Sequence, residues 1–230
     1  MFSLQQFVCI THNFLLQGVE FIMHDRINAI IVMTSIHMKI RYFLIALLLL
    51  VVVACKPPAQ QNQFSATDVT GADFAQTLNL TDHTGKPRSL ADFKGKVVAI
   101  FFGYTHCPDV CPTTMADMKK TMKLLGARAD ELQVLFVTLD PERDTQEVLA
   151  QYVPSFDKRF IGLFGTKEET AKATSDFKIF ASKVENSGRS GYTIDHSAGL
   201  YLYDKTGKIR LYVAYGEKPA VIAADIEKLL

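Results

Sequence analysis

Two nearly continuous apolar runs stand out along the chain, at residues 96–102 and 132–139. Runs of this length without regular polar alternation are typical of strands that are buried on both faces. A shorter apolar segment at residues 160–164 predicts a third strand or the remnant of one. Because doubly buried strands need helices on both sides of their sheet, this pattern favours an α/β domain.

Helical segments are expected between and after these runs, where apolar positions recur at helical spacing and capping residues mark the ends. In the segment at 167–182 we expect Ala171, Phe177 and Phe180 to lie on one face. The expected helices are 111–125, one opening after Asp144 and Thr145, 167–182, and a C-terminal helix that begins at Pro219.

Glycine-containing turns predict two hairpins. One surrounds Gly85 in residues 79–86, and the other joins segments 199–203 and 208–213 through the turn at 204–207. The resulting order, βαβα followed by ββα, is the order of a thioredoxin-like fold. We therefore predict a three-layer α/β domain with a central mixed β-sheet, plus an N-terminal hairpin.

The N-terminal part of the chain has a different pattern. Residues 38–55 combine basic Lys39 and Arg41, an apolar stretch and a terminal Ala-Cys pair, which is the layout of an export signal. The ending VVAC resembles the lipobox of bacterial lipoproteins, in which the cysteine, here Cys55, receives the lipid. The apolar run from Tyr42 to Ala54 has 13 residues, fewer than the about 20 that a membrane-spanning helix needs. We expect a lipid anchor in the cell envelope, facing the periplasm or extracytoplasmic space.

The segments on either side of this signal carry further expectations. Export signals begin a protein, so we interpret residues 1–37 as an artefact of start assignment, with Met38 as the true start. Residues 56–67 are polar, contain proline and lack periodicity, which predicts a flexible tether. The folded domain is then expected at residues 68–230.

Composition narrows the function classes. The 25 basic and 24 acidic residues nearly cancel, which argues against a nucleic-acid partner because phosphate binding needs an excess of Lys and Arg. Four cysteines in 230 residues are too few for a disulfide scaffold.

Two of these cysteines, Cys107 and Cys111, lie where a buried strand leads into a helix. Pro112 is tolerated only in a first helical turn, so it marks the helix start. The backbone N–H groups and the helix dipole there are expected to lower the pKa of both thiols. Cys107 then lies in the loop or in the first turn, and if that turn is helical, a spacing of four places both sulfurs on one face. On an exposed edge, two thiolates could bind a soft metal or form a disulfide.

His196 is the third member of the expected site. In a thioredoxin-like topology the loop before the last hairpin faces the N-terminus of the active helix, so His196 can approach the two cysteines despite its distance in sequence. Two thiolates and one imidazole suit Cu(I), and the same donors accept zinc or Cu(II).

Several neighbours have both a functional and a structural interpretation. Asp195 could orient the imidazole from outside the metal's own ligands or could cap a turn. His106 and His83 are interpreted as bystanders, with His83 facing solvent beside the hairpin turn. The remaining expectations are a core position for Met115, a helix N-cap for Asp144, partner docking as a secondary interpretation for Asp140, Pro141 and Asp144, and walls of the site for Phe101, Phe102 and Tyr104.

Three motifs together resemble the Sco/SenC family of thioredoxin-fold copper proteins. They are GYTHCPDVCPTT at 103–114, VTLDPERDT at 137–145 and DHSAGLYLYD at 195–204. The resemblance implies copper, as Cu(I) or Cu(II), bound by Cys107, Cys111 and His196. It also implies delivery of copper to the dinuclear copper site of cytochrome c oxidase. The implied partners are the copper-bearing oxidase subunit and another copper carrier or thiol reductase.

Two other interpretations of the cysteines stay open. A structural disulfide would close a very short loop and stabilise little. A metal-free thiol–disulfide oxidoreductase, which would keep the oxidase cysteines reduced, suits the fold equally well. Against it, the spacing is CxxxC rather than CxxC, and residues 195–196 stand where thioredoxins place a cis-proline.

Overall fold

A computed structural model of the chain describes residues 33, 38–41, 43, 64–185 and 191–230. The expectations for residues 1–37, for the signal at 38–55 with Cys55, and for most of the tether fall largely or wholly outside the described residues. Met33, residues 38–41 and Phe43 have helical backbone and exposed side chains. Within the described part of the chain, no helix has the length and apolar character needed to cross a membrane.

The described domain begins at Phe64, a few residues earlier than the expected start at 68. The backbone N–H groups of Ser65 and Ala66 donate to the buried carboxylate of Asp225, at 2.9 and 2.8 Å. The next two residues form a short strand on the edge of the central sheet. The last part of the predicted tether is therefore fixed to the domain.

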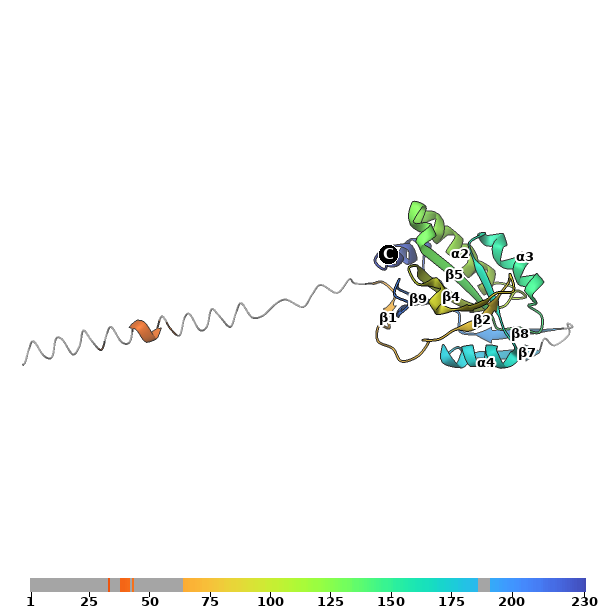
Figure 1. The fold of residues 1–230 in the computed structure, drawn as a ribbon, viewed down its shortest axis with the longest axis horizontal. Helices are drawn as coiled ribbons and strands as arrows, with labels where there is room; N and C mark the ends of the chain where they lie inside the picture. The colour runs from red at the N-terminus through yellow and green to blue at the C-terminus, as the bar shows by residue number, and fades with distance from the viewer. Residues whose placement is uncertain (1–32, 34–37, 42, 44–63, 186–190) are drawn as a thin grey trace, which may run out of the picture. The chain divides into compact units, whose positions relative to one another are not determined.

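An eight-stranded mixed sheet forms the centre of the domain (Figure 1). Its order is β1-β10-β9-β4-β5-β6-β2-β3; β4, β5 and β6 are mutually parallel, and the other neighbours pair antiparallel. The bounds are β1 Thr67–Asp68, β2 Asn79–Asp82, β3 Pro87–Ser89, β4 Val97–Gly103, β5 Leu132–Thr138, β6 Ile161–Phe164, β9 Leu200–Tyr203 and β10 Ile209–Val213.

The two apolar runs of the sequence are the central strands. Every residue of β4 and of β5 is buried, and the two strands pair in parallel along their whole length. Side chains on both faces of these strands are therefore buried, which confirms the prediction of doubly buried strands. β6 follows as the third parallel strand, at the expected place.

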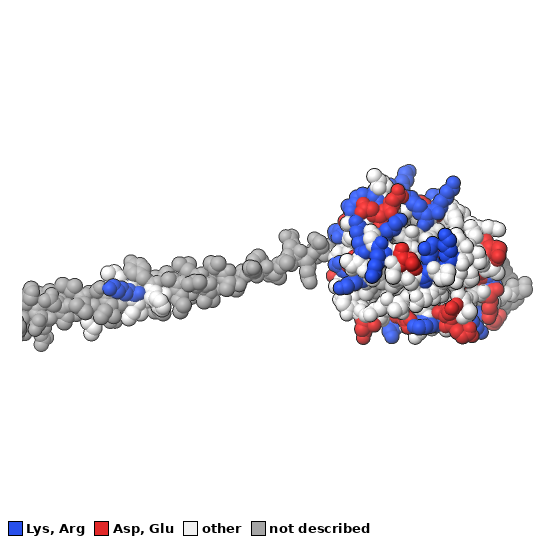
Figure 2. Space-filling model, viewed as in Figure 1, with Lys and Arg blue, Asp and Glu red and all other residues white. Residues whose placement is uncertain are grey.

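Helices and a second, small sheet cover the two faces. Figure 1 shows α2, α3 and the C-terminal α5 on one face, and α4 with the hairpin β7–β8 on the other. The charged side chains of both signs are interspersed over the face drawn in Figure 2. The bounds are α2 Val110–Leu125, α3 Gln146–Phe156, α4 Lys167–Asp176, α5 Pro219–Glu227, the 3₁₀ helices η1 Leu90–Phe93 and η2 Gly126–Glu131, β7 Ala181–Glu185 and β8 Tyr192–His196.

One helix is shorter than predicted. The helix expected at 167–182 ends at Asp176, because Lys178 adopts a left-handed backbone conformation with φ of 55°. The three residues expected on one face differ in burial: Phe177 is buried, whereas Ala171 is exposed and Phe180 is 63% exposed. The end of the predicted helix, from Ala181, belongs instead to β7.

The segment that carries His196 is also different from the prediction. Residues 192–196 form β8, which pairs antiparallel with β7 and places Ala181 opposite His196. The expectation of a loop at this point was wrong. The partner strand β7 was not predicted either. All of its residues are exposed, so β7 lacks the alternation of apolar and polar positions that reveals a half-buried strand.

Candidate metal centre

The two cysteines lie at the N-terminus of α2, at the C-terminal end of the fully buried β4. Cys111 is in the first helical turn, followed by Pro112, and Cys107 lies in the turn before the helix. The backbone N–H of Cys111 donates to the Cys107 sulfur over 3.4 Å. The predicted placement at a helix start is confirmed, and Cys107 lies in the loop, one of the two positions that the sequence left open.

Burial distinguishes the two thiols. Cys107 is half-buried, and Cys111 has no exposed surface. Burial raises the pKa of the Cys111 thiol well above its ordinary value, because a thiolate there loses its hydration. The prediction that the helix dipole lowers both pKa values is therefore wrong for Cys111. Desolvation, which raises the pKa of this thiol, outweighs the backbone hydrogen bond of Tyr104, which lowers it.

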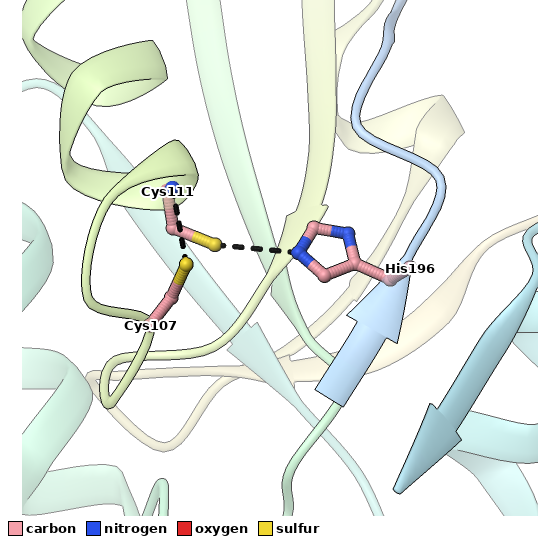
Figure 3. A group of neighbouring side chains, drawn as sticks. All are labelled: Cys107, Cys111 and His196. Carbon is pink, nitrogen blue, oxygen red and sulfur yellow. Dashed lines mark hydrogen bonds between the residues drawn. The ribbon is translucent and has the colours of Figure 1, made fainter. Parts of the chain in front are cut away.

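His196 meets this pair from the end of β8 (Figure 3). Its Nε2 lies 3.5 Å from the Cys111 sulfur, and its Nδ1 lies 2.9 Å from the carbonyl oxygen of Ser197. A carbonyl oxygen only accepts, so Nδ1 donates the proton and Nε2 keeps its lone pair toward the sulfurs. The Cys107 and Cys111 sulfurs and a ring nitrogen of His196 all lie within 4.8 Å of one another.

This donor set fits a soft metal ion. Thiolate sulfur selects Cu(I) and zinc among the common metals, and imidazole accepts either. With three protein donors, an incoming ligand could bind the ion as a fourth donor. Among the described residues this is the one group of histidine, cysteine and carboxylate side chains close enough to hold an ion.

Aromatic rings enclose the imidazole. The rings of Phe101 and Tyr104 lie 6.2 and 6.0 Å from the His196 ring, both edge-on. The Tyr104 hydroxyl also accepts a hydrogen bond from the backbone N–H of Ile194, at 3.1 Å. Phe102 points to the opposite side of the sheet and packs on Phe177, with ring centroids 4.9 Å apart. Two of the three predicted aromatic walls therefore line the site.

The close packing behind the cysteines depends on Gly103. A Cβ atom at this position would lie 2.8 Å from the Cys111 sulfur, 2.8 Å from the Phe101 ring and 3.1 Å from the Phe136 ring. Glycine is thus required for Cys111 to sit directly against β4.

Asp144 supports the cysteine loop and is not the helix cap that was predicted. The N-cap of α3 is Thr145, whose side chain accepts from the Val148 N–H. The buried Asp144 carboxylate instead accepts from the backbone N–H of Thr105 at 3.0 Å, and from the hydroxyls of Thr105 and Thr138 at 2.5 and 2.6 Å. It fixes the backbone two residues before Cys107.

The other predicted neighbours are spread around the site. Asp195 is exposed, and side chains alternate along β8, so it points away from the face of His196; the Ser197 carbonyl makes the contact to the ring. His106 is exposed, with Nδ1 3.1 Å from the Thr105 hydroxyl. Met115 is buried in the core, as expected.

His83 lies away from the cysteines, in the turn between β2 and β3 at the edge of the sheet. Its Nδ1 accepts from the backbone N–H of Gly162 at 2.9 Å, so the prediction of a solvent-facing side chain was wrong. The β2–β3 turn is thereby attached to β6.

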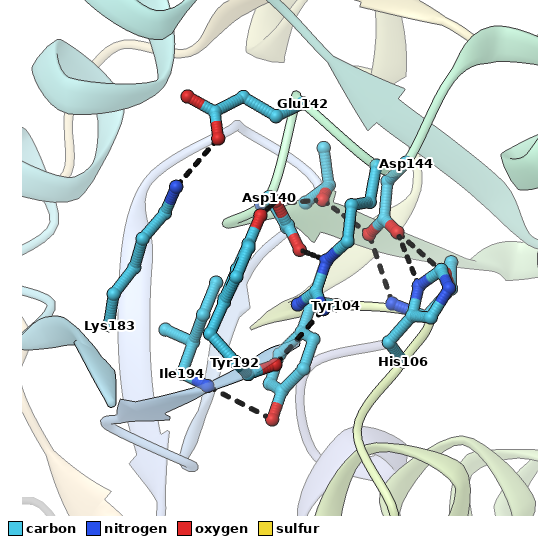
Figure 4. Close-up of polar contacts among 11 residues, drawn as sticks. Tyr104, His106, Asp140, Glu142, Asp144, Lys183, Tyr192 and Ile194 are labelled. Atoms are coloured by element: carbon cyan, nitrogen blue, oxygen red, sulfur yellow. Dashed lines mark hydrogen bonds and ion pairs between the residues drawn. The ribbon is translucent and has the colours of Figure 1, made fainter. Parts of the chain in front are cut away.

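Three contributors were not identified from the sequence: Arg143, Tyr192 and Ser197. Arg143, in the loop at 139–145, donates to the carbonyl oxygen of Tyr192 in β8. The Tyr192 hydroxyl donates in return to Asp140 of the same loop (Figure 4). Arg143 lies in the motif VTLDPERDT and Ser197 in DHSAGLYLYD, but Tyr192 lies in none of the three motifs. A motif by itself does not indicate which distant segment it contacts.

Comparison with known proteins gives consistent results. The SCO1/SenC family model matches residues 66–230. The mitochondrial protein SCO2 homolog of Mus musculus is 35% identical over 153 residues, which are 66% of this chain and 60% of that protein. The SCO2-like protein of Rickettsia felis is 36% identical over 155 residues, 66% of this chain and 74% of that protein. The chain therefore spans about 60% of the length of the mouse relative.

Two solved structures have the same fold. The structure of Bradyrhizobium japonicum ScoI with copper bound is 38% identical, covers 67% of this chain and 98% of its own, and has a TM-score of 0.62. Yeast Sco1 with copper bound is 27% identical, covers 66% of this chain and 85% of its own, and has a TM-score of 0.60.

Proposed function

The chain belongs to the SCO1/SenC family, and we propose that it binds one copper ion through the Cys107 and Cys111 sulfurs and His196 Nε2. The observation that carries this proposal is the meeting of two thiols and one imidazole within 4.8 Å. Supporting it, the similar ScoI of Bradyrhizobium japonicum was solved with copper bound.

Delivery of that copper to the dinuclear copper site of a cytochrome c oxidase subunit is the second part of the proposal. The half-buried Cys107 is the more accessible ligand, and Cys111 is enclosed. An incoming thiolate of the client would form its Cu–S bond first, and the bond to Cys107 would then break. Further client donors would replace His196 and finally Cys111, and the released thiolates would be left on this chain or take up protons from water. The ion changes ligands without becoming free in solution, and its oxidation state does not change.

The segment at 38–55 completes the proposal by fixing where this happens. Lipid attachment at Cys55 would hold the domain at a membrane, on the extracytoplasmic side where an oxidase presents its copper-bearing subunit. Palmitate labelling of the expressed chain in a bacterial host, with Cys55→Ser as the control, tests this part separately; equal labelling of both would contradict it.

A transfer experiment tests delivery. The full chain is loaded with Cu(I) and mixed with the reduced, metal-free copper domain of an oxidase subunit, and the two are then separated and assayed for metal. We expect most of the copper on the client. Retention on the full chain, under conditions where the client takes copper from a small-molecule complex, would contradict delivery.

A thiol–disulfide oxidoreductase is the second candidate, and one contact favours it. The N–H of Cys111 donates to the sulfur of Cys107, the more accessible of the two cysteines. As a thiolate, Cys107 would attack a client disulfide, and Cys111 would then release the client as two thiols. Two electrons and two protons pass to the client while Cys107 and Cys111 form a disulfide. His196→Ala should retain this exchange and lose tight copper binding.

A further inference from the structure

The strand that carries His196 is not part of the central sheet. Among the described residues, the backbone ladder of β8 joins it to β7 alone, in a separate two-stranded sheet. At its far end, residues 197–199 connect it directly to β9. The position of the imidazole relative to the cysteines therefore depends on this short connection and on side-chain contacts to β8.

The loop at residues 139–145, between β5 and α3, makes contacts on both sides of the site. Through Asp144 it holds Thr105, next to the cysteine turn. Through Asp140 and Arg143 it holds Tyr192, the first residue of β8. One short segment thus joins the backbone around Cys107 to the strand that ends at His196.

Arg143 makes the central contact of this connection. Its Nη1 donates to the carbonyl oxygen of Tyr192 at 3.0 Å, and its Nε pairs with the Asp140 carboxylate. Its guanidinium carbon lies 3.6 Å from the centre of the Tyr192 ring, in stacking geometry. The Tyr192 hydroxyl donates in turn to Asp140 at 2.7 Å, which closes a ring of contacts (Figure 4).

A second link runs parallel to the first. Lys183 of β7 donates to Glu142 of the same loop at 2.6 Å, and its Nζ lies 4.3 Å from the Tyr192 ring centre. This pair is more exposed than the Arg143 contacts, so screening by water reduces its contribution.

The partly buried position of Arg143 has a cost in folding free energy. Its side chain is 24% exposed, and its Nη2 is buried without a hydrogen-bond partner among the described residues. A buried donor without a partner costs free energy. The planar, forked guanidinium is nevertheless the group that can pair with a carboxylate, donate to a carbonyl and stack on a ring at the same time.

We propose that Arg143 is a positioning residue of the metal site, which holds β8 through Tyr192 so that His196 Nε2 faces the cysteine sulfurs. The inference rests on the proposed function, because its effect is measured as copper binding. Arg143 does not contact the ion; it acts through the strand that carries the nitrogen ligand.

The test compares Arg143→Met with a matched control in the full chain. Arg88→Met is the control, because Arg88 also pairs with a buried aspartate, Asp82, and lies near an aromatic ring, but on β3. Cu(I) affinity is measured by competition with a chromophoric chelator. We expect Arg143→Met to weaken binding about 10- to 100-fold, the range for residues that orient a metal ligand, and Arg88→Met to bind as the wild type does. Equal affinity of the two variants would overturn the inference.

A double variant shows whether the effect passes through the imidazole. In a His196→Ala background, Arg143→Met should cause no further loss of affinity, whereas an additional loss of similar size would contradict action through His196. If His196→Ala binds copper as tightly as the wild type, the proposed function fails. If His196→Ala loses binding but Arg143→Met binds as the wild type does, only this inference fails.

Tyr192→Phe keeps the test available if Arg143→Met does not fold. It removes only the hydroxyl that donates to Asp140, and Tyr203→Phe, which removes a buried hydroxyl bonded to the Ala75 carbonyl, is its control. On Cu(II) loading, the nitrogen hyperfine signal of the imidazole in electron paramagnetic resonance should weaken or become heterogeneous in Tyr192→Phe only. Identical spectra for both variants would overturn the inference.

Discussion

The two sides of the metal site are built in different ways. The cysteines lie at the end of β4, in the middle of the eight-stranded sheet, and Cys111 is completely buried against Gly103. His196 lies at the end of β8, in a two-stranded sheet whose partner strand is entirely exposed. The sulfur side therefore shares the rigidity of the core, and the nitrogen side depends on a few polar contacts.

Because of this difference, we expect the buried cysteine side to hold the ion and the peripheral histidine side to allow its release. A buried cysteine at a helix start keeps its position without the metal, because backbone hydrogen bonds and core packing fix it. A ligand on a peripheral strand can move without disturbing the central sheet. We expect His196 and Cys107 to be the ligands that are replaced first during transfer, and Cys111 to be the last to release the ion.

Removing the buried sulfur should have the largest effect. In Cys111→Ser a hard hydroxyl replaces a thiolate, so we expect Cu(I) affinity to fall by more than about 100-fold, beyond the range for residues that only support a ligand. Competition with a chelator measures it. Met115→Leu, one helical turn later in the core, is the control; if it loses affinity as strongly, the two-cysteine site is wrong.

Crowding the sulfur should have an intermediate effect. In Gly103→Ala the new methyl group meets the Cys111 sulfur at 2.8 Å, so we expect a loss of about 1–3 kcal/mol in stability and about tenfold in Cu(I) affinity. Gly162→Ala is the control, because Gly162 lies on β6 and its Cβ would lie 3.0 Å from Val153 of α3, with no sulfur among its three nearest atoms. Urea denaturation and chelator competition should show that the control loses stability alone; an equal loss of copper affinity in both would contradict the role of Gly103.

A carboxylate remote from the site should affect stability and leave copper affinity unchanged. Burial alone would raise the pKa of Asp82, but hydrogen bonds from Thr84, Arg88 and the backbone outweigh it and hold this pKa well below 3.8. Its contribution is therefore present above pH 3.8 and lost as the pH falls further. Asp82→Asn should cost about 2 kcal/mol at neutral pH and progressively less in acid, measured by urea denaturation. A deficit that grows in acid would contradict this assignment.

The smallest effect is expected at Asp195, although it is the immediate neighbour of His196. Its side chain is exposed on the other face of β8, so Asp195→Asn should change Cu(I) affinity by less than about twofold. A loss of tenfold or more would show that this carboxylate supports the imidazole in place of the Ser197 carbonyl.

Much of the fold could be predicted because its signals are local. The central strands β4 and β5 are apolar throughout, and Pro219 marks the start of the C-terminal helix. The errors lie where the signal is not local. Phe177 and Phe180 have helical spacing, but the helix ends at Asp176, and the left-handed Lys178 lies between the two phenylalanines. The exposed β7 has no apolar pattern by which a strand could be recognised.

The site shows the same division. Cys107, Cys111 and His196 were identified because their residue types and motifs carry the chemistry, and the structure brings them together. The raised pKa of Cys111 was not predicted, because burial depends on the whole fold while the helix start is visible in sequence. The roles of Asp144 and Arg143 were missed for a related reason: Thr105 and Tyr192, their partners, are distant in sequence.

The most direct test of the central claim is a competitive Cu(I) titration of the reduced full chain, with wild type and His196→Ala measured side by side. The account predicts tight binding of one ion by the wild type and a large loss of affinity in the variant, with dithiol exchange retained. Weak binding that is the same in both proteins would contradict the three-ligand site and leave the dithiol reductase as the better explanation.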